Sequence, residues 1–212
     1  SHICLSKIKS FTARLPTLKQ VVIFDYASSD NNSINNSISY QEILDNYEPN
    51  EIDFERVGFD HPLYIMYSSG TTGVPKCIVH GHGGTLVQHL KEHQLQTNIS
   101  AGDRVFYFTT CSWMMWNWLV SALGTGATIM LYDGSPTYPD NIVLWRFADE
   151  EQFSHFGTSA KYIETLMKND VSPNTIFKLK NLKAICSTGS PLSAECYDYI
   201  YNNVGYVHLA SI

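Results

Sequence analysis

Apolar runs and amphipathic stretches alternate along the chain from about residue 100 to its last residue. Short β-branched or aromatic runs predict strands, and apolar residues spaced three and four apart predict helices. The predicted strands are residues 104–108, 127–131, 153–156, 183–186 and 206–209, and the predicted helices are residues 114–123, 142–148, 160–168 and 194–201. This alternation predicts an α/β fold with a largely parallel sheet covered by helices on both faces. Ligands of such sheets bind beyond the carboxyl ends of the strands, so the loops there are the place to look for function.

The region before residue 100 is less regular. Residues 21–24 predict a strand, residues 28–37 a polar loop, and Ser39 the N-cap of a short helix. Two further strands, residues 63–67 and 77–79, enclose a loop rich in Ser, Thr and Gly. After it, helical spacing is kept by Leu86, His89, Leu90 and His93.

The loop between those two strands carries the strongest chemical signal. Glycine allows a backbone with positive φ, which turns successive N–H groups into one anion-binding hollow. Hydroxyl side chains add donors, and a terminal lysine adds a charge that suits phosphate. The residues of this kind are Ser68, Ser69, Gly70, Thr71, Thr72, Gly73 and Lys76. A plain surface turn also favours Gly and Ser, but it needs neither four hydroxyls nor the lysine.

Two other loops follow predicted strands. The aromatic segment, residues 113–118, places large apolar side chains and one amide at the start of a helix. Such a segment is either packed core or the lining of a pocket, and the sequence leaves both readings open. A second turn contains Gly189, Ser190 and Pro191, with Ser193 as the N-cap of the next helix. Alone, it would be an ordinary connection between a strand and a helix.

Composition narrows the classes of protein. The chain has 212 residues, a formal net charge of −6 and a pI near 5.7, which disfavours a nucleic-acid surface. Five scattered cysteines argue against both a disulfide framework and a structural zinc site. His80 and His82, two residues apart in a glycine-rich turn, are poor zinc ligands, and we predict no metal site built from this chain. No apolar run is long enough to span a membrane, and the sequence predicts a cytoplasmic protein.

The loop string S-S-G-T-T-G-V-P-K, residues 68–76, closely resembles the phosphate loop of the adenylate-forming superfamily. The resemblance is to its acetoacetyl-CoA synthetase branch, and it continues through residues 78–84, 113–117, 131–136, 156–159 and 187–193. Two positions depart from the family pattern. Cys77 stands where glycine is usual, and Ser190 stands where many members have Glu.

The resemblance implies a site and a reaction. Lys76, Thr71 and Thr72 would act in catalysis, and the whole loop would hold ATP. Gly189, Ser190 and Pro191 would contact its adenine. The acyl pocket would be formed by Trp113, Met114, Trp116 and Asn117. ATP with Mg²⁺ and coenzyme A would convert a short carboxylic acid, acetoacetate, to its thioester, a step of lipid metabolism.

The family also implies an organisation. Residues 1–60 and 61–212 would be two portions of one large domain. We expect this domain to be incomplete at its C-terminal end, and the chain alone to be inactive, because family motifs that follow are absent. Two alternatives stay open: a non-catalytic nucleotide-binding protein, or an adenylation domain that uses another acid such as acetate or that loads a carrier protein.

Overall fold

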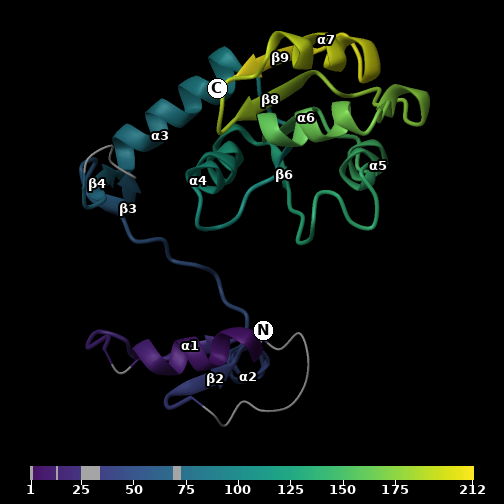
Figure 1. The fold of residues 1–212 in the computed structure, drawn as a ribbon. Coiled ribbons are helices and arrows are strands. Elements are labelled where there is room, and N and C mark those ends of the chain that lie inside the picture. The colour runs from purple at the N-terminus through teal and green to yellow at the C-terminus, as the bar shows by residue number, and fades with distance from the viewer. Residues whose placement is uncertain (1, 13, 25–33, 69–72) are drawn as a thin grey trace. The chain divides into compact units, whose positions relative to one another are not determined.

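The computed structural model describes residues 2–12, 14–24, 34–68 and 73–212. The chain divides into two compact units, residues 1–56 and residues 57–212, and each is described by itself. Figure 1 shows the elements of both units. None of the helices in the described part of the chain is long and apolar enough to cross a membrane.

The first unit contains two helices and a pair of short strands. Its elements are α1 (His2–Thr12), β1 (Val21–Ile23), β2 (Ser37–Ser39) and α2 (Tyr40–Asn46). Strands β1 and β2 are parallel, with Val21 opposite Ser37. The Ser39 hydroxyl accepts a hydrogen bond of 2.9 Å from the Glu42 amide, which confirms the predicted N-cap of α2. The predicted loop at residues 28–37 falls largely on residues 25–33, which lie outside the described residues.

The second unit begins with an antiparallel hairpin. Strand β3 (Pro62–Ser68) pairs with β4 (Lys76–Gly81), and α3 (His82–Lys91) follows directly. The helix continues as one turn of π-helix, η2 (Glu92–Gln96). The hairpin and the helix match the two strands and the helical spacing predicted for this region.

A five-stranded parallel sheet makes up the rest of the unit, in the order β6-β5-β7-β8-β9. Its strands are β5 (Arg104–Tyr107), β6 (Thr128–Met130), β7 (His155–Ser159), β8 (Ala184–Thr188) and β9 (His208–Ser211). The connecting helices are α4 (Met114–Ser121), α5 (Val143–Glu150), α6 (Ala160–Lys168) and α7 (Ala194–Asn203). Three single turns complete the unit: η3 (Ala122–Thr125), η4 (Pro173–Thr175) and η2. The predicted α/β fold with a helix-covered parallel sheet is confirmed.

Each face of the sheet carries its own core. On one face, Phe106, Phe156 and Ile185 pack with apolar residues of α5, α6 and α7. On the other, Val105 and Tyr107 pack with residues of α4. Successive residues of a strand point to opposite faces, so β5 supplies both cores from adjacent positions. Figure 1 shows the strands and the helices that cover them.

Gly157 of β7 has no side chain, and the Tyr107 ring occupies the space that a side chain would fill. A Cβ atom at this position would lie 2.0 Å from the Tyr107 ring, so that any side chain there would collide with it. The Tyr107 hydroxyl donates a hydrogen bond of 3.1 Å to the Thr158 carbonyl, which holds the ring across β7.

The amino-terminal edge of the sheet is closed by a polar network. Asp103, before β5, accepts hydrogen bonds from the Lys183 ammonium at 2.7 Å and from the Ser100 amide at 2.9 Å. Burial alone would raise the pKa of the Asp103 carboxyl, but these hydrogen bonds outweigh it and lower the pKa to about 2. This edge is thereby fixed, whereas the predicted turn at residues 189–191 follows β8 at the opposite, carboxyl-terminal edge.

Candidate functional site

The β3–β4 hairpin holds the two ends of the predicted phosphate loop opposite each other. Ser68, the last residue of β3, pairs with Lys76, the first residue of β4, and Tyr67 pairs with Cys77. The middle of the loop, Ser69, Gly70, Thr71 and Thr72, lies outside the described residues. The structure therefore brings the first and last candidates of the loop together across one register position.

The described part of this loop is open to solvent. Gly73 has a φ of 124°, a backbone conformation that L side chains rarely adopt, and no atom lies within 4 Å of where its Cβ would be. Val74 is 87% exposed, and Lys76 is also exposed. No acidic side chain of the described residues forms an ion pair with Lys76. Its charge is free to meet an anion.

The second glycine turn lies at the carboxyl end of β8. Gly189 has a φ of 92°, and no atom lies within 4 Å of a Cβ built there. Ser190 and Pro191 are exposed and line a cleft of about 410 Å³ together with residues of α6 and α7. Both predicted loops thus present an open, left-handed glycine, as a close approach to a ligand requires.

The aromatic segment at the start of α4 is divided between core and surface. Met115 and Trp118 are buried and belong to the core under the sheet. Trp113 and Met114 are 37% and 45% exposed. Trp116 and Asn117 are half-buried and line a cavity. Two residues of the segment are therefore packed core and two line a cavity, whereas their role as an acyl pocket stays a prediction.

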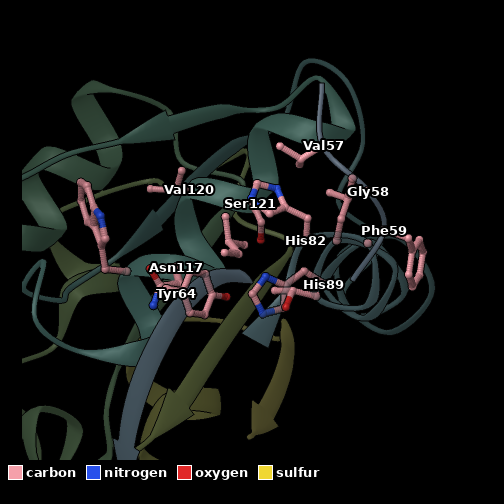
Figure 2. A pocket seen from close by; sticks show the side chains of 14 residues that line it. Val57, Gly58, Phe59, Tyr64, His82, His89, Asn117, Val120 and Ser121 are labelled. Carbon is pink, nitrogen blue, oxygen red and sulfur yellow. The ribbon is translucent and has the colours of Figure 1, made fainter. Parts of the chain in front are cut away.

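That cavity, here called the α3–α4 cavity, has a volume of about 500 Å³. It lies between α3, α4, β3 and the segment that precedes β3. Its lining is Val57, Gly58, Phe59, Leu63, Tyr64, His82, Gly83, Thr85, Leu86, His89, Trp116, Asn117, Val120 and Ser121. Figure 2 shows Tyr64, His89, Asn117 and Ser121 around the cavity. The Asn117 amide is 3.4 Å from Met66 Sδ, which orients it toward the hairpin.

Two ionisable side chains that line the α3–α4 cavity have pKa values shifted toward the neutral form. Burial raises the pKa of the Tyr64 phenol, although a hydrogen bond with the Thr85 side chain opposes this, so the hydroxyl stays protonated. Burial lowers the pKa of His89, against the opposing charge of Glu92. His89 Nδ1 is buried and has no hydrogen-bond partner within the described part of the protein.

A fully buried histidine, His93, contacts Ser121, one of the residues that line the cavity. Its Nε2 is 2.9 Å from the Ser121 hydroxyl, which itself donates to the Trp118 carbonyl at 2.7 Å. His93 therefore donates from Nε2, and Nδ1 carries no proton. The His93 ring packs 4.3 Å from the Trp118 ring, and burial lowers the pKa of His93 to about 4.

Sequence reasoning did not find this cavity, although one signal was present. Helical spacing in α3 places Leu86 and His89 on one helix face, and α4 supplies Trp116 and Asn117. His80 and His82 lie instead beside aromatic rings, Tyr64 at 5.3 Å and His61 at 5.8 Å respectively. Across the described ranges, no group of three or more His, Cys, Asp or Glu side chains could hold a metal ion.

Comparison with known proteins identifies the family of the chain. The chain matches the family described as AMP-binding enzyme over residues 1–208. It is 46% identical over 210 residues to the acetoacetyl-CoA synthetase of Gallus gallus, covering 96% of this chain and 32% of that protein. It is 50% identical over 181 residues to the acetoacetyl-coenzyme A synthetase of Rhizobium meliloti, covering 85% of this chain and 28% of that protein. The chain belongs to the AMP-binding enzyme family.

Solved structures show the same fold. An acetoacetyl-CoA synthetase from Streptomyces lividans matches with a TM-score of 0.86 and 35% identity, over 98% of this chain and 32% of that one. The anthranilate CoA ligase AuaEII matches with a TM-score of 0.79 and 17% identity, over 99% of this chain and 39% of that one, which shows the fold alone. The chain spans about a third of the length of the curated relatives it matches.

Proposed function

We propose that the protein uses ATP to activate a short carboxylic acid, acetoacetate, as an acyl-adenylate and then transfers the acyl group to coenzyme A, with release of AMP. The register of the hairpin carries this proposal. Ser68 and Lys76 face each other at the mouth of a loop whose composition suits phosphate. A lysine charge with no acidic partner in the described part of the chain suits the phosphates of ATP.

In the first step, a carboxylate oxygen attacks the α-phosphorus of ATP and pyrophosphate leaves. Phosphoryl and nucleotidyl transfer depend on positioning and on charge stabilisation rather than on a protein nucleophile. Lys76, Thr71 and Thr72 would stabilise the charge on the departing pyrophosphate. Ser68, Ser69, Gly70 and Gly73 would complete the phosphate cradle, and Gly189, Ser190 and Pro191 would bind the adenine through their backbone.

Magnesium would enter with the nucleotide. The described residues contain no cluster of acidic or imidazole groups for a metal, so they do not form a protein cage for it. Mg²⁺ usually keeps several waters and binds substrate phosphates, and in this way it would neutralise their charge. In the second step, the coenzyme A thiol attacks the acyl carbonyl and AMP leaves.

The names of the relatives support the choice of acid. Several are acetoacetyl-CoA synthetases, and the Penicillium aethiopicum malonamoyl-CoA synthetase vrtB is 41% identical over 234 residues, covering 100% of this chain and 32% of that protein. The acyl groups in both names are short and carry a carbonyl at the third carbon. The acyl group would bind at Trp113, Met114, Trp116 and Asn117. We further propose that the reaction belongs to lipid metabolism and takes place in the cytoplasm.

Removal of the Lys76 charge tests the proposal. In the complete natural polypeptide, Lys76→Ala should lower acetoacetate-dependent pyrophosphate release roughly tenfold to a hundredfold, because a hydrogen bond to a charged group contributes about 1.5–3 kcal/mol. Lys168→Ala is the matched control, since Lys168 is exposed and pairs with Glu164 on α6. Unchanged release in the Lys76 variant would contradict the assignment. Pyrophosphate release without coenzyme A thioester would favour loading of a carrier protein instead.

A further inference from the structure

The α3–α4 cavity extends well past Trp116 and Asn117, the two lining residues that the proposed function assigns to the acyl group. Trp116 and Asn117 lie in the first turn of α4, close to the carboxyl end of the sheet, whereas Val120 and Ser121 lie one turn further along. At 1.5 Å per residue, this turn adds about 6 Å of depth. The volume of about 500 Å³ is within the range of roughly 300–1,000 Å³ that holds drug-sized ligands. Acetoacetate alone would leave most of the cavity empty.

The lining specifies the chemistry of an occupant. None of the described residues that line the cavity is Asp, Glu, Lys or Arg. Aliphatic and aromatic side chains predominate, among them Leu63, Leu86 and Val120. A phosphate or carboxylate would lose its hydration there without a compensating charge. The cavity therefore suits the uncharged, largely apolar end of a ligand.

Two neutral hydrogen-bonding groups interrupt this apolar lining. The Tyr64 and Thr85 side chains both line the cavity, and because each hydroxyl can donate as well as accept, this part of the lining has a donor for a ligand. Neutral His89 can donate from either ring nitrogen, and its Nδ1 is buried without a described partner. A buried polar atom left unsatisfied is costly, so a neutral acceptor such as a ketone would be favoured here.

We propose that the α3–α4 cavity binds the hydrocarbon tail of 3-oxo acids longer than acetoacetate, with six to eight carbons, and that Tyr64 and His89 donate hydrogen bonds to the 3-oxo group. This assignment rests on the proposed acid activation. Tyr64, His89 and Val120 are then specificity-determining residues, and they take no part in the chemical step.

An acid series with the complete natural polypeptide tests the size of the site. Pyrophosphate release is measured with acetoacetate, 3-oxohexanoate and 3-oxooctanoate. The proposal expects kcat/KM for 3-oxohexanoate within about tenfold of that for acetoacetate, since added methylenes bury apolar surface without collision. Activity with acetoacetate and none with either longer acid would overturn the proposal and leave the proposed function standing.

Filling the inner end of the cavity tests its location. Val120→Phe should lower kcat/KM for the two longer acids at least tenfold and leave acetoacetate within about twofold, because the added ring takes up the space of the tail. Val87→Phe is the matched control: Val87 lies on α3, is 61% exposed and does not line the cavity. Thermal unfolding of both variants shows whether they fold, and Val120→Leu replaces Val120→Phe where the latter does not. Equal losses for all three acids would overturn the assignment.

Removing one hydroxyl tests the recognition of the ketone. Tyr64→Phe should reduce the preference for 3-oxohexanoate over hexanoate by roughly threefold to tenfold, mainly through KM, because one hydrogen bond is lost while the ring remains. An unchanged preference would remove Tyr64 from the proposal.

Binding without turnover separates the two proposals. The amide of 3-oxohexanoate cannot be adenylated, and saturation-transfer NMR reports its binding in the absence of ATP. Binding that is lost in Val120→Phe and kept in Val87→Phe supports the cavity even where acetoacetate is not activated, which would refute the proposed function alone. Activation of acetoacetate without binding of the amide would refute the cavity alone.

Discussion

Apolar side chains fill the five-stranded sheet and the β3–β4 hairpin alike, but they are buried in the first and exposed in the second. Phe156 and Ile185 of the sheet have no solvent exposure, whereas Ile65 and Val79 of the hairpin are 54% and 58% exposed. Burial of apolar surface stabilises the sheet, and the hairpin depends more on its backbone pairing. The sheet is therefore the scaffold, while the hairpin presents a loop that the scaffold does not hold by packing.

Opening a cavity in the core of the sheet should have the largest effect on stability. Phe156→Ala should lower the free energy of unfolding by about 3–5 kcal/mol, because it removes the ring that stacks 4.4 Å from Trp145. Ile65→Ala, the matched change in the hairpin, should cost less than about 1 kcal/mol. Native-state hydrogen exchange of the β7 and β8 amides measures both. A loss for Ile65→Ala as large as that for Phe156→Ala would show that the hairpin side chains are packed in solution.

Acid should weaken the packing of His93, in η2, against Trp118 of α4. Burial lowers the pKa of His93 from about 6.5 to about 4, so the unfolded chain binds this proton more readily. The contribution of neutral His93 to stability is complete above about pH 6.5 and is lost as the pH falls toward 4. The slope reaches at most about 1.4 kcal/mol per pH unit for one proton.

His93→Gln checks the source of this pH dependence. The amide has no proton to gain in this range, so the slope of unfolding free energy between pH 6.5 and 4 should become smaller. His155, which is also buried with a lowered pKa and whose Nε2 lies 3.0 Å from the Thr97 carbonyl, remains in the variant and preserves part of the slope. An unchanged slope would assign the acid sensitivity to other groups.

The smallest effects are expected for alanine at Gly189 and at Gly84, two glycines that both have open space around the Cβ position. Gly189→Ala should destabilise the turn by about 1–2 kcal/mol and raise KM for ATP, because its φ of 92° is strained for alanine. Gly84→Ala should instead stabilise α3 by about 0.5–1 kcal/mol, since Gly84 is an exposed helical residue with no atom near a Cβ. Thermal unfolding and an ATP titration distinguish the two variants. If both variants changed the unfolding free energy in the same direction, backbone conformation would not explain either effect.

The alternation of strands and helices could be predicted because burial repeats with the period of each element. The predicted boundaries of strands were less exact where a residue is buried but is not paired with a neighbouring strand. Residues 153–156 were predicted as a strand, yet β7 begins at His155, and Phe153 precedes it. Phe153 is apolar because it packs 5.0 Å from Phe106 and 4.9 Å from Phe147, and not because it belongs to the strand. Helix α1 was missed, and its first turn has no acidic residue to mark the start of a helix.

One part of the candidate site could likewise be predicted from the sequence, and another part could not. The hairpin that frames residues 68–76 was predictable because its chemistry lies in one continuous string. The α3–α4 cavity was not, because its lining comes from segments around residues 57–64, 82–89 and 116–121, which meet only through tertiary packing. Trp116 and Asn117 were found by sequence, whereas Tyr64 and His89 carry no local signature of a cavity.

The contact between Gly157 and Tyr107 makes two positions fifty residues apart in sequence dependent on each other. No side chain at residue 157 can be accommodated while the Tyr107 ring lies across β7, and no ring can lie there if residue 157 gains a side chain. In this family, a substitution of residue 157 should therefore follow, and not precede, the replacement of Tyr107 by a smaller residue. Relatives with alanine or a larger residue at the position of Gly157 should carry a small residue at the position of Tyr107. The two columns should covary even though neither residue lies in a loop that faces the candidate site.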